Sequence, residues 1–326
     1  MIERTCNLSP RLITSAAIRS SLLPEQTFSS ISNRPTLSSI TYHGLGMNTV
    51  GPLVDSAWLA AHLGDPGLRV IDFRWQEGQP GRPGYEAGHI PGAVFVDLEA
   101  DGLSGHQAGG GRHPLPGRHA FEAAMRDAGV NHDSAVVAYD DQNGFTACRL
   151  WWTLRYFGHD AVAVLDNGLA GWPGALATGW DSALRGDFVA GVPRTSMKVD
   201  YRDVRKLPGD SILLDARRPD RYRGEVEPTD PRAGHVPGAF SAPWGGNLDS
   251  EGRFKTPDEL CRRFSDLRVQ DGSHVVAYCG SGVSACVNLL ALEIAGLTGA
   301  RLYPGSWSDW STRSDAPAAT GTGVPI

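Results

Sequence analysis

One cysteine and the short loop that follows it could do nucleophilic chemistry in this chain of 326 residues. A β-type run, residues 273–278, leads directly into Cys279, and the loop 280–284, which reads G-S-G-V-S, leads on into an apolar helical stretch. A thiol in such a loop faces converging backbone N–H groups and the positive end of a helix dipole, and both stabilise an anion. They also lower the pKa of a thiol. The pattern therefore predicts that Cys279 is a thiolate nucleophile.

The composition is that of a soluble globular protein. Hydrophobic residues make up 41% of the chain and charged residues 20%, and no apolar run is long enough to span a membrane. The formal net charge of −6 argues against nucleic acid as a partner. The cysteines are odd in number and widely spaced, so they suggest neither a disulfide framework nor a paired metal motif. We therefore expect no metal, no cofactor, no membrane partner and a reducing compartment, the cytoplasm.

Residues 1–46 differ from the rest of the chain. They contain nine serines, four arginines and only two acids, without sustained hydrophobic periodicity. An arginine- and serine-rich, acid-poor start is typical of a mitochondrial transit peptide. Because the apolar residues are too scattered for an amphipathic helix, we favour a disordered or upstream extension. A mitochondrial location is the alternative to the cytoplasm.

The rest of the chain contains the same series of motifs twice. Small differences in spacing between the copies are explained by loop insertions and deletions. We predict two homologous domains, residues 50–178 and 198–316, joined by a linker over 179–196. The repeated motifs are G-H-I-P-G-A at 88–93 and G-H-V-P-G-A at 234–239, V-I-D-F-R at 70–74 and L-L-D-A-R at 213–217, and V-V-A-Y at 136–139 and 275–278.

Both halves alternate β-rich runs with amphipathic helical runs. This alternation predicts an α/β fold in which each domain has a central parallel sheet flanked by helices. Ligands bind such sheets at the carboxyl ends of the strands, where Cys279 lies. The first half carries Asp140 at the matching place, and a carboxylate cannot accept sulfur as a thiolate does, so we expect only the second domain to be catalytic. Helices are predicted over 55–63, 119–128, 146–157, 256–264 and 284–295.

Taken together, these motifs resemble those of the two-domain sulfurtransferases of the rhodanese superfamily. The resemblance covers about residues 50–316 and includes the paired G-H-[IV]-P-G-A motifs, Trp151 and Trp152, the G-S-W-S-D-W sequence at 305–310 and the cysteine loop. In this family the cysteine thiolate takes a sulfur atom from a small donor, holds it as a persulfide and passes it to an acceptor. The resemblance implies two tandem rhodanese-like domains and the same chemistry at Cys279, with cyanide or a thiol such as thioredoxin as acceptor.

The loop also bears on the donor. Its sequence C-G-S-G-V resembles the loop of family members that use 3-mercaptopyruvate, whereas members that prefer thiosulfate carry basic residues just after the cysteine. The resemblance therefore implies 3-mercaptopyruvate, with thiosulfate as the alternative donor. Gly280 and Gly282 can turn the loop N–H groups, including those of Val283 and Ser284, toward a bound anion without hindrance from a Cβ.

Further site residues are implied by the family match. In the mercaptopyruvate enzymes a serine two residues past the cysteine pairs with a histidine and an acid of the first domain, and the matching residues here are Ser281, His113 and Glu99. This trio could move a proton to or from the donor. Without the match, Ser281 would be read as a turn residue and His113 as a surface loop residue.

Arginines are expected to hold the anionic donor, because a carboxylate or thiosulfate needs charge-assisted hydrogen bonds. Arg221 matches the family's donor-binding arginine. A second arginine usually follows in a Glu-Pro-Arg sequence, but this chain has Thr229 at that position, and we expect Arg232 to substitute for it. In the absence of the match, all of these would be ordinary solvated loop charges.

Two other functions were considered. A phosphatase with a loop cysteine requires an arginine six residues later to hold the phosphate, and this chain has Ala285 there, which excludes that class. A non-catalytic sulfur-carrier or binding module is the second alternative. The intact cysteine loop argues against it for the whole chain, although the first half on its own fits that description. Cys148 and Cys286, which occupy equivalent positions in the two halves, are interpreted as core residues.

Overall fold

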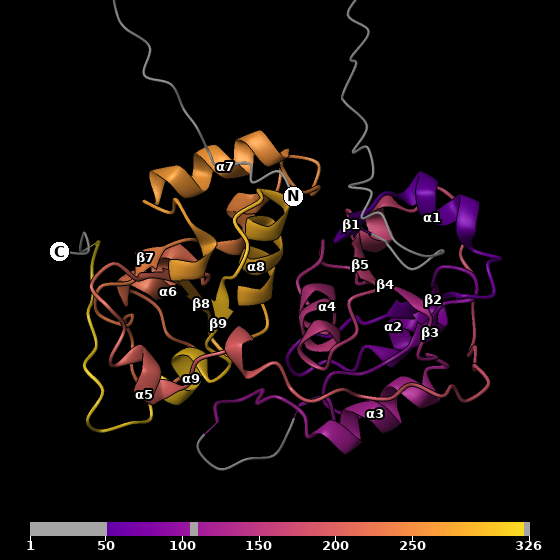
Figure 1. Ribbon diagram of the computed structural model, residues 1–326, viewed down its shortest axis with the longest axis horizontal. Coiled ribbons are helices and arrows are strands. Elements are labelled where there is room, and N and C mark those ends of the chain that lie inside the picture. Colours follow the sequence, from indigo (N-terminus) through magenta and orange to yellow (C-terminus); the bar gives the residue numbers. More distant parts are fainter. Residues whose placement is uncertain (1–50, 105–109, 323–326) are drawn as a thin grey trace, which may run out of the picture.

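The computed structural model describes residues 51–104 and 110–322, so the extension expected over residues 1–46 lies outside the described residues. The described chain forms two lobes side by side (Figure 1), the first coloured indigo to magenta and the second orange to yellow. Each lobe is built around one sheet in which all strands are parallel. The α/β architecture expected from the alternating sequence pattern is thereby confirmed.

The sheet of the first lobe has five strands in the order β1-β5-β4-β2-β3. Its strand β4 is buried on both faces, because Val136 and Ala138 belong to one apolar cluster and Val137 and Tyr139 to another. This alternation follows from the two-residue period of a strand. The strands are β1 (Leu53–Val54), β2 (Leu68–Asp72), β3 (Val94–Phe95), β4 (Ala135–Tyr139) and β5 (Val162–Leu165).

The sheet of the second lobe repeats this arrangement. Its four strands have the order β7-β6-β8-β9, and a parallel backbone bridge between Lys198 and Leu302 stands where β1 stands in the first lobe. The repeated sequence motifs therefore correspond to a repeated topology. The strands are β6 (Ile212–Asp215), β7 (Phe240–Ser241), β8 (Val275–Tyr278) and β9 (Arg301–Leu302).

The five helices predicted from the sequence are confirmed, each with ends within two residues of the expected ones. Asp55 caps the first of them by accepting a hydrogen bond from the Trp58 N–H at 2.7 Å. Thr256 and Glu259 form a capping box at the start of another. These helices are α1 (Ser56–His62), α3 (Arg118–Asp127), α4 (Ala147–Tyr156), α7 (Pro257–Asp266) and α8 (Ala285–Ile294). Four shorter helices were not predicted: α2 (Arg82–Ala87), α5 (Tyr201–Val204), α6 (Pro219–Arg223) and α9 (Ser306–Trp310).

A buried ion pair holds the repeated G-H-x-P-G turn in each lobe. In the second lobe, Arg217 pairs with Asp215 at 2.7 Å, and its Nη2 also donates to the carbonyl oxygen of Gly234 at 2.6 Å. The first lobe repeats these contacts with Arg74, Asp72 and Gly88. The strand end and the turn are thus tied together by the same side chain in both copies.

The histidines of the two turns have structural surroundings. His89 stacks on Tyr85 with ring centroids 3.9 Å apart, and His235 stacks on Tyr222 at 3.7 Å. In both, Nδ1 lies within hydrogen-bond distance of the carbonyl oxygen of the same tyrosine. No hydrogen bond or ion pair of the described residues joins either histidine to the cysteine loop, so both histidines have a structural role in their turns.

The two lobes share one apolar core. Helices α4 and α8 lie side by side between the sheets (Figure 1), and one buried cluster includes side chains of both, among them Leu150, Trp151, Val287 and Leu290. Burial of apolar surface across the boundary stabilises one relative position of the lobes. Side chains of the first lobe can therefore be held at fixed distances from the second.

Each lobe also sends one loop into the other. Gly111 of the first lobe packs so closely on the second that a Cβ there would lie 2.4 Å from the Gly305 carbonyl oxygen. Gly252 of the second lobe approaches Asn143 of the first in the same way, at 2.8 Å. Both glycines have a φ of 81°, which L-residues rarely adopt. The first of these loops carries Arg112 and His113 toward the cysteine loop.

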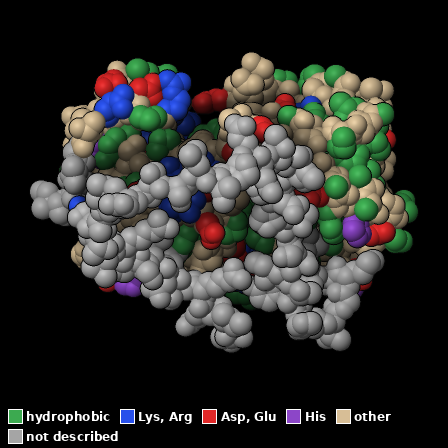
Figure 2. Space-filling view, turned by 90° about the horizontal axis from the view of Figure 1, so that it is seen from above, with side chains coloured by type: hydrophobic (Ala, Val, Ile, Leu, Met, Phe, Trp, Pro, Cys, Tyr) green, Lys and Arg blue, Asp and Glu red, His purple; other side chains and the backbone are tan. Residues whose placement is uncertain are grey.

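Figure 2 shows basic and acidic side chains next to one another at the edge of one lobe. Within residues 51–104 and 110–322, no helix combines the length and the apolar character needed to cross a membrane.

Candidate active site

Strand β8 places Cys279 at the carboxyl edge of the second sheet. The residue is 2% exposed, and the Gly282 N–H lies 3.1 Å from its Sγ. Helix α9 anchors its backbone, since Ser306 Oγ accepts from the Cys279 N–H at 3.1 Å and the Trp307 N–H donates to the Cys279 carbonyl oxygen at 2.9 Å. The predicted nucleophile is therefore fixed at a strand end, beside a backbone donor.

The loop after Cys279 can turn back on the thiol because Gly282 adopts a φ of 79°. A Cβ at this position would lie 2.5 Å from the carbonyl oxygen of Pro304, so only glycine fits. Val283 and Ser284 are buried behind it, and Ser284 is the N-cap residue of α8. The loop N–H groups and the N-terminus of this ten-residue helix together favour a negative charge at the sulfur.

The matching loop of the first lobe contains a negative charge. Asp140 is completely buried, and its carboxylate accepts hydrogen bonds at 2.7–2.9 Å from the N–H groups of Gln142, Gly144, Thr146 and Ala147. Burial raises the pKa of Asp140, and the four N–H groups act in the opposite direction. A loop of the same origin thus surrounds an anionic group with backbone donors, as a thiolate or persulfide at Cys279 requires.

Ser281, His113 and Glu99 form a continuous hydrogen-bonded chain. His113 Nδ1 lies 2.8 Å from Ser281 Oγ, and its Nε2 lies 3.1 Å from Glu99 Oε1. His113 and Ser281 are buried, whereas the Glu99 side chain is 57% exposed. The trio implied by the family match is therefore brought together across the two lobes, with one end beside Cys279 and the other in solvent.

The protonation of His113 follows from its surroundings. Burial lowers the pKa of His113 below its usual value, and the hydrogen bond with Glu99 acts against this effect. A neutral imidazole has one donor and one acceptor nitrogen. The Ser281 hydroxyl can donate to Nδ1 while the Nε2–H donates to Glu99, so the neutral ring satisfies both partners.

A buried arginine that the sequence analysis missed connects the two lobes at this site. Arg149 of α4 is 1% exposed, and it donates from Nη1 to the carbonyl oxygen of Gly282 at 2.9 Å and from Nη2 to that of His113 at 3.0 Å. One guanidinium group thus orients both the cysteine loop and the His113 segment. Its position within the amphipathic run 146–157 offered no local signal of this role.

Arg221 lies beside the cysteine loop, as expected. It projects from α6, and its Nη1 lies 3.4 Å from the point that a Cβ on Gly280 would occupy. Its Nη2 pairs with Glu227 at 2.5 Å and with Asp230 at 3.1 Å. Both carboxylates are buried, and burial raises the pKa of Asp230. A cation with unused donors therefore faces the space next to the nucleophile.

Arg232 has a different role from the expected one. Its guanidinium group donates to four backbone carbonyl oxygens at 2.7–3.1 Å, those of Trp310, Ser311, Arg313 and Ala316. These carbonyl groups lie at and beyond the end of α9, where a cation satisfies acceptors that have no partner within the helix. Because its donors are engaged there, Arg232 does not replace the arginine missing at Thr229.

Cys148 and Cys286 lie in the core, in agreement with the prediction. Both are fully buried. Burial raises the pKa of Cys286 to about 12 and that of Cys148 well above its usual value. Both therefore remain thiols at neutral pH, and Cys279 is the loop cysteine suited to attack.

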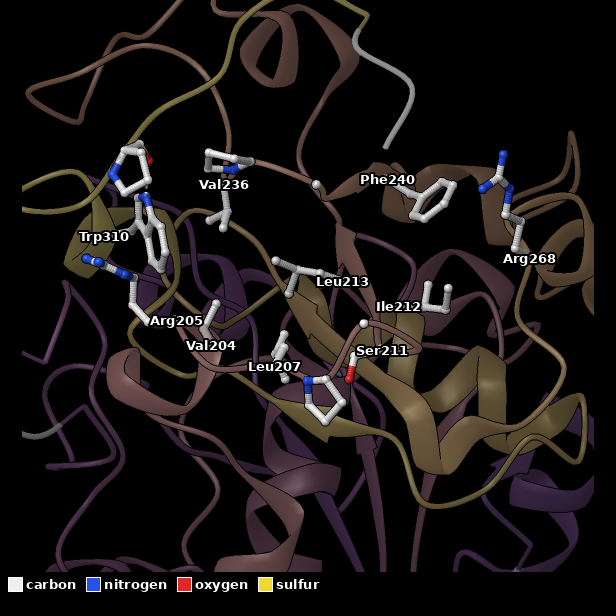
Figure 3. A pocket seen from close by; sticks show the side chains of 15 residues that line it. Val204, Arg205, Leu207, Ser211, Ile212, Leu213, Val236, Phe240, Arg268 and Trp310 are labelled. Atoms are coloured by element: carbon white, nitrogen blue, oxygen red, sulfur yellow. Dashed lines mark hydrogen bonds between the residues drawn. The ribbon is translucent and has the colours of Figure 1, made fainter. Parts of the chain in front are cut away.

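A surface cavity of about 380 Å³ lies at the opposite end of the second sheet (Figure 3). Ile212, at the start of β6, lines it, whereas Cys279 follows the far end of the neighbouring parallel strand β8. Figure 3 shows Val204, Leu213 and Val236 around this space. Its lining contains no cysteine, histidine or acidic residue, and it is separate from the cysteine loop.

Comparison with known proteins agrees with this geometry. The family model of the rhodanese-like domain matches the chain twice, over residues 55–175 and 201–313. The chain belongs to the rhodanese family. The first match contains strands β2 to β5, and the second contains β6 to β9 together with Cys279 and its loop.

Relatives in this family are similar over most of their length. A probable 3-mercaptopyruvate sulfurtransferase of Pseudomonas aeruginosa is 47% identical over 280 residues, which cover 82% of this chain and 98% of that protein. A putative thiosulfate sulfurtransferase, SseB of Mycobacterium tuberculosis, is 42% identical over 284 residues, covering 83% and 97%. The crystal structure of SseA from Escherichia coli, a rhodanese-fold enzyme, superposes with a TM-score of 0.70 at 39% identity, covering 79% of this chain and all of that one. The rhodanese-like sulfurtransferase assignment made from the sequence is confirmed.

Proposed function

We propose that this rhodanese transfers sulfur from 3-mercaptopyruvate through a persulfide on Cys279. The observation that best supports this proposal is the Ser281–His113 hydrogen bond of 2.8 Å. It provides a path for proton transfer that ends two residues from the nucleophile. Cleavage of the C–S bond of 3-mercaptopyruvate leaves an enolate, and a proton must be delivered to its carbon atom to form pyruvate. The name of the Pseudomonas aeruginosa relative supports the same donor.

The first half-reaction begins with attack of the Cys279 thiolate on the sulfur of the donor. The new S–S bond forms as the C–S bond breaks, and the electron pair of that bond leaves with the carbon as the enolate of pyruvate. Ser281 passes the donor's thiol proton to the neutral His113 ring, and the same proton returns through Ser281 to the enolate carbon. Glu99, half-exposed at the end of the chain, connects His113 with solvent. The products are pyruvate and the Cys279 persulfide.

The second half-reaction returns the enzyme to its starting state. A nucleophilic acceptor attacks the outer sulfur of the persulfide, the S–S bond breaks, and the Cys279 thiolate is the leaving group. Cyanide would give thiocyanate, and a thiol would give a new persulfide. Thioredoxin is the protein acceptor that we propose, because a dithiol can release the sulfur as sulfide by closing its own disulfide.

Thiosulfate is a second candidate donor. It is anionic like 3-mercaptopyruvate, and the relative from Mycobacterium tuberculosis carries the name of a thiosulfate enzyme. Cleavage of thiosulfate releases sulfite, a stable anion that needs no proton. With thiosulfate as donor, the Ser281–His113–Glu99 chain would transfer no proton to the product. We therefore rank thiosulfate second.

Mass spectrometry of the purified protein tests both the persulfide and the donor. After treatment with 3-mercaptopyruvate we expect a gain of about 32 Da on the peptide that contains Cys279, and kcat/KM should be higher for 3-mercaptopyruvate than for thiosulfate. No mass gain with either donor would contradict the persulfide mechanism. A clear preference for thiosulfate would overturn the choice of donor.

We propose a cytoplasmic location and domain limits of 50–178 and 198–316. The wide spacing of the cysteines in the sequence supports this location, and the two family matches fall inside these limits. Cell fractionation of a tagged full-length chain tests the location, with accumulation in mitochondria as the contrary result. Limited proteolysis tests the limits, with first cuts expected within 179–196.

A further inference from the structure

Helix α4 carries a buried cation that has no carboxylate partner among the residues described. Arg149 donates to two neutral acceptors, the carbonyl oxygens of Gly282 at 2.9 Å and His113 at 3.0 Å. None of the ion pairs within residues 51–104 and 110–322 includes it, and its buried Nε has no acceptor there. Removing a charge from water costs free energy unless an opposite charge compensates it. The fold therefore keeps a positive charge here at the expense of stability.

The first lobe alone does not explain this charge. Asp140 is also completely buried and follows β4, just before α4, yet no ion pair of the described residues joins it to Arg149. Backbone N–H groups hold its carboxylate instead. Because Cys148 matches Cys286, the residue that matches Arg149 in the second half is Val287. The cation thus belongs only to the copy without the nucleophile, and it is directed at the other copy.

Gly282 connects Arg149 with the sulfur of Cys279. Its carbonyl oxygen accepts from the guanidinium group, and its N–H lies 3.1 Å from Cys279 Sγ. The side chains whose negative charge would act on Arg149 are the thiols of Cys279 and Cys286. Cys286 stays protonated at neutral pH, because burial raises its pKa to about 12. Within the described residues, Cys279 is therefore the group that can supply the missing negative charge.

We propose that Arg149 is a positioning residue that provides the buried counter-charge for the Cys279 thiolate and for its persulfide. This inference rests on the proposed function, in which Cys279 alternates between these two anions. An opposite charge stabilises an anion more strongly in the protein interior than in water. A protonated Cys279 would leave Arg149 uncompensated. The first lobe therefore favours the reactive form of a nucleophile that lies in the second lobe.

Alkylation of Cys279 by iodoacetamide, followed on its peptide by mass spectrometry from pH 5 to 9, tests the proposal. Arg149→Gln removes the charge but can still donate to one carbonyl oxygen, and it should move the midpoint of the pH profile up by about one pH unit. Arg149→Lys keeps the charge and should stay close to the wild type, although it loses the fork. An unchanged midpoint in Arg149→Gln, or an equal shift in both variants, would overturn the proposal.

Arg155→Gln is the matched control. Arg155 lies on the same helix and joins the lobes through an ion pair of 3.1 Å with Glu293 of α8. Its loss should lower stability and leave the midpoint of the alkylation profile unchanged. A purely structural role of Arg149 would give this same pattern in Arg149→Gln.

Other charged groups at the cysteine loop are common to all these variants. They are His113, which contacts Ser281, and the cluster of Arg112, Arg221, Asp230 and Glu227 beside Gly280. Arg149 also acts against protonation of His113 and lowers its pKa. The comparison is therefore repeated in the His113→Ala background, where the shift caused by Arg149→Gln should persist. Loss of the shift in that background would overturn the proposal.

A second measurement applies if Arg149→Gln does not fold. Cys279→Ser removes the anion and keeps Arg149. If Arg149 compensates the thiolate, ionisation of Cys279 stabilises the folded state. The stability of the wild type relative to Cys279→Ser should then increase as the pH rises toward about 8.5, where free thiols ionise. A difference that stays constant with pH would contradict the proposal. Failure of the proposed function reads out differently, because the wild type would then gain no sulfur from 3-mercaptopyruvate while the alkylation profiles still differ.

Discussion

At the scale of single residues, Cys279, the proposed nucleophile of this rhodanese, and Cys286 are two buried thiols with different surroundings. Cys279 has a backbone N–H at 3.1 Å from its sulfur, while Cys286, seven residues later, has a pKa raised to about 12 by burial. Both thiols are almost completely buried. Exposure therefore does not distinguish them, and Cys279 differs in lying at a strand end, where the loop turns the Gly282 N–H toward its sulfur.

Cys279→Ser should abolish sulfur transfer and leave the fold intact, because an alcohol is far less acidic than a thiol and cannot carry a persulfide. Cys286→Ser should retain transfer and lose some stability, since it places a hydroxyl in an apolar core. Turnover with cyanide as acceptor and thermal unfolding measure the two effects. If Cys286→Ser were as inactive as Cys279→Ser, the roles assigned to the two cysteines would be wrong.

His113→Ala should reduce kcat with 3-mercaptopyruvate on the order of 100-fold and affect thiosulfate turnover little, because only the enolate needs a proton. Burial lowers the pKa of His113. The ring therefore stays neutral at pH values somewhat below about 6.5, the usual pKa of histidine. The wild-type rate with 3-mercaptopyruvate should therefore hold as pH falls to about 6.5 and decline only below it. Rates measured with both donors from pH 5 to 8 check this, and equal losses with both donors would make His113 structural.

At the scale of elements, the active loop depends on one strand end, one helix start and the segment behind them. A Cβ on Gly282 would lie 2.5 Å from the Pro304 carbonyl oxygen, so the loop can pass this oxygen only with glycine at position 282. Arg149 of α4 then binds the Gly282 carbonyl oxygen from the other lobe. The loop is thus enclosed by backbone on one side and by a buried cation on another.

Gly282→Ala should destabilise the protein by at least about 2 kcal/mol, because a positive φ costs an L-residue about 1–2 kcal/mol and the added Cβ meets backbone that cannot move aside. Activity should fall with it. Gly209→Ala is the matched control, since a Cβ there meets nothing within 4 Å. Urea unfolding of both variants measures the difference, and similar midpoints for the two would contradict the packing argument.

At the scale of the whole molecule, the two homologous lobes complete one another. The loop after Gly111 brings Arg112 and His113 to the cysteine loop, and the corresponding loop of the second lobe brings Phe254 to the first, where its N–H donates to Asp166 at 2.9 Å. The first lobe carries Asp140 in place of a cysteine, and it supplies His113 and Glu99 of the candidate site. Neither lobe would hold the complete set of candidate site residues alone.

Asp166, which lies at this interface, should make the stability of the folded protein depend on pH. Burial raises its pKa to about 6, so the folded protein binds this proton more tightly than the unfolded chain does. The protonated Asp166 carboxyl therefore stabilises the folded state fully below about pH 4. This stabilisation is lost as the pH rises through about 6. Asp166→Asn does not titrate, so its stability relative to the wild type should increase from pH 4 to pH 7 by up to about 2 kcal/mol.

Unfolding midpoints measured at several pH values test this difference. Exposed Asp133→Asn controls for the loss of a carboxylate without burial. A difference between Asp166→Asn and the wild type that stays constant with pH would contradict the prediction.

The local sequence by itself determined the repeated α/β topology, the five longer helices and the setting of Cys279. Each of these depends on contacts within a few residues: strand alternation, capping by Asp55 or Thr256, and glycines beside a strand end. The family resemblance added Ser281, His113, Glu99 and Arg221, which the structure brings to the cysteine loop.

Only the tertiary structure decided which arginines lie beside the cysteine loop. Arg232, three residues from the missing arginine, was expected in the site, but the carbonyl groups at the end of α9 bind its guanidinium group. Arg112 and Arg149 come from the other lobe, more than 100 residues away in sequence, and long flexible side chains of this kind carry no periodic signal. Their positions depend on how the lobes pack through α4 and α8, and the sequence pattern of one domain contains no record of that packing.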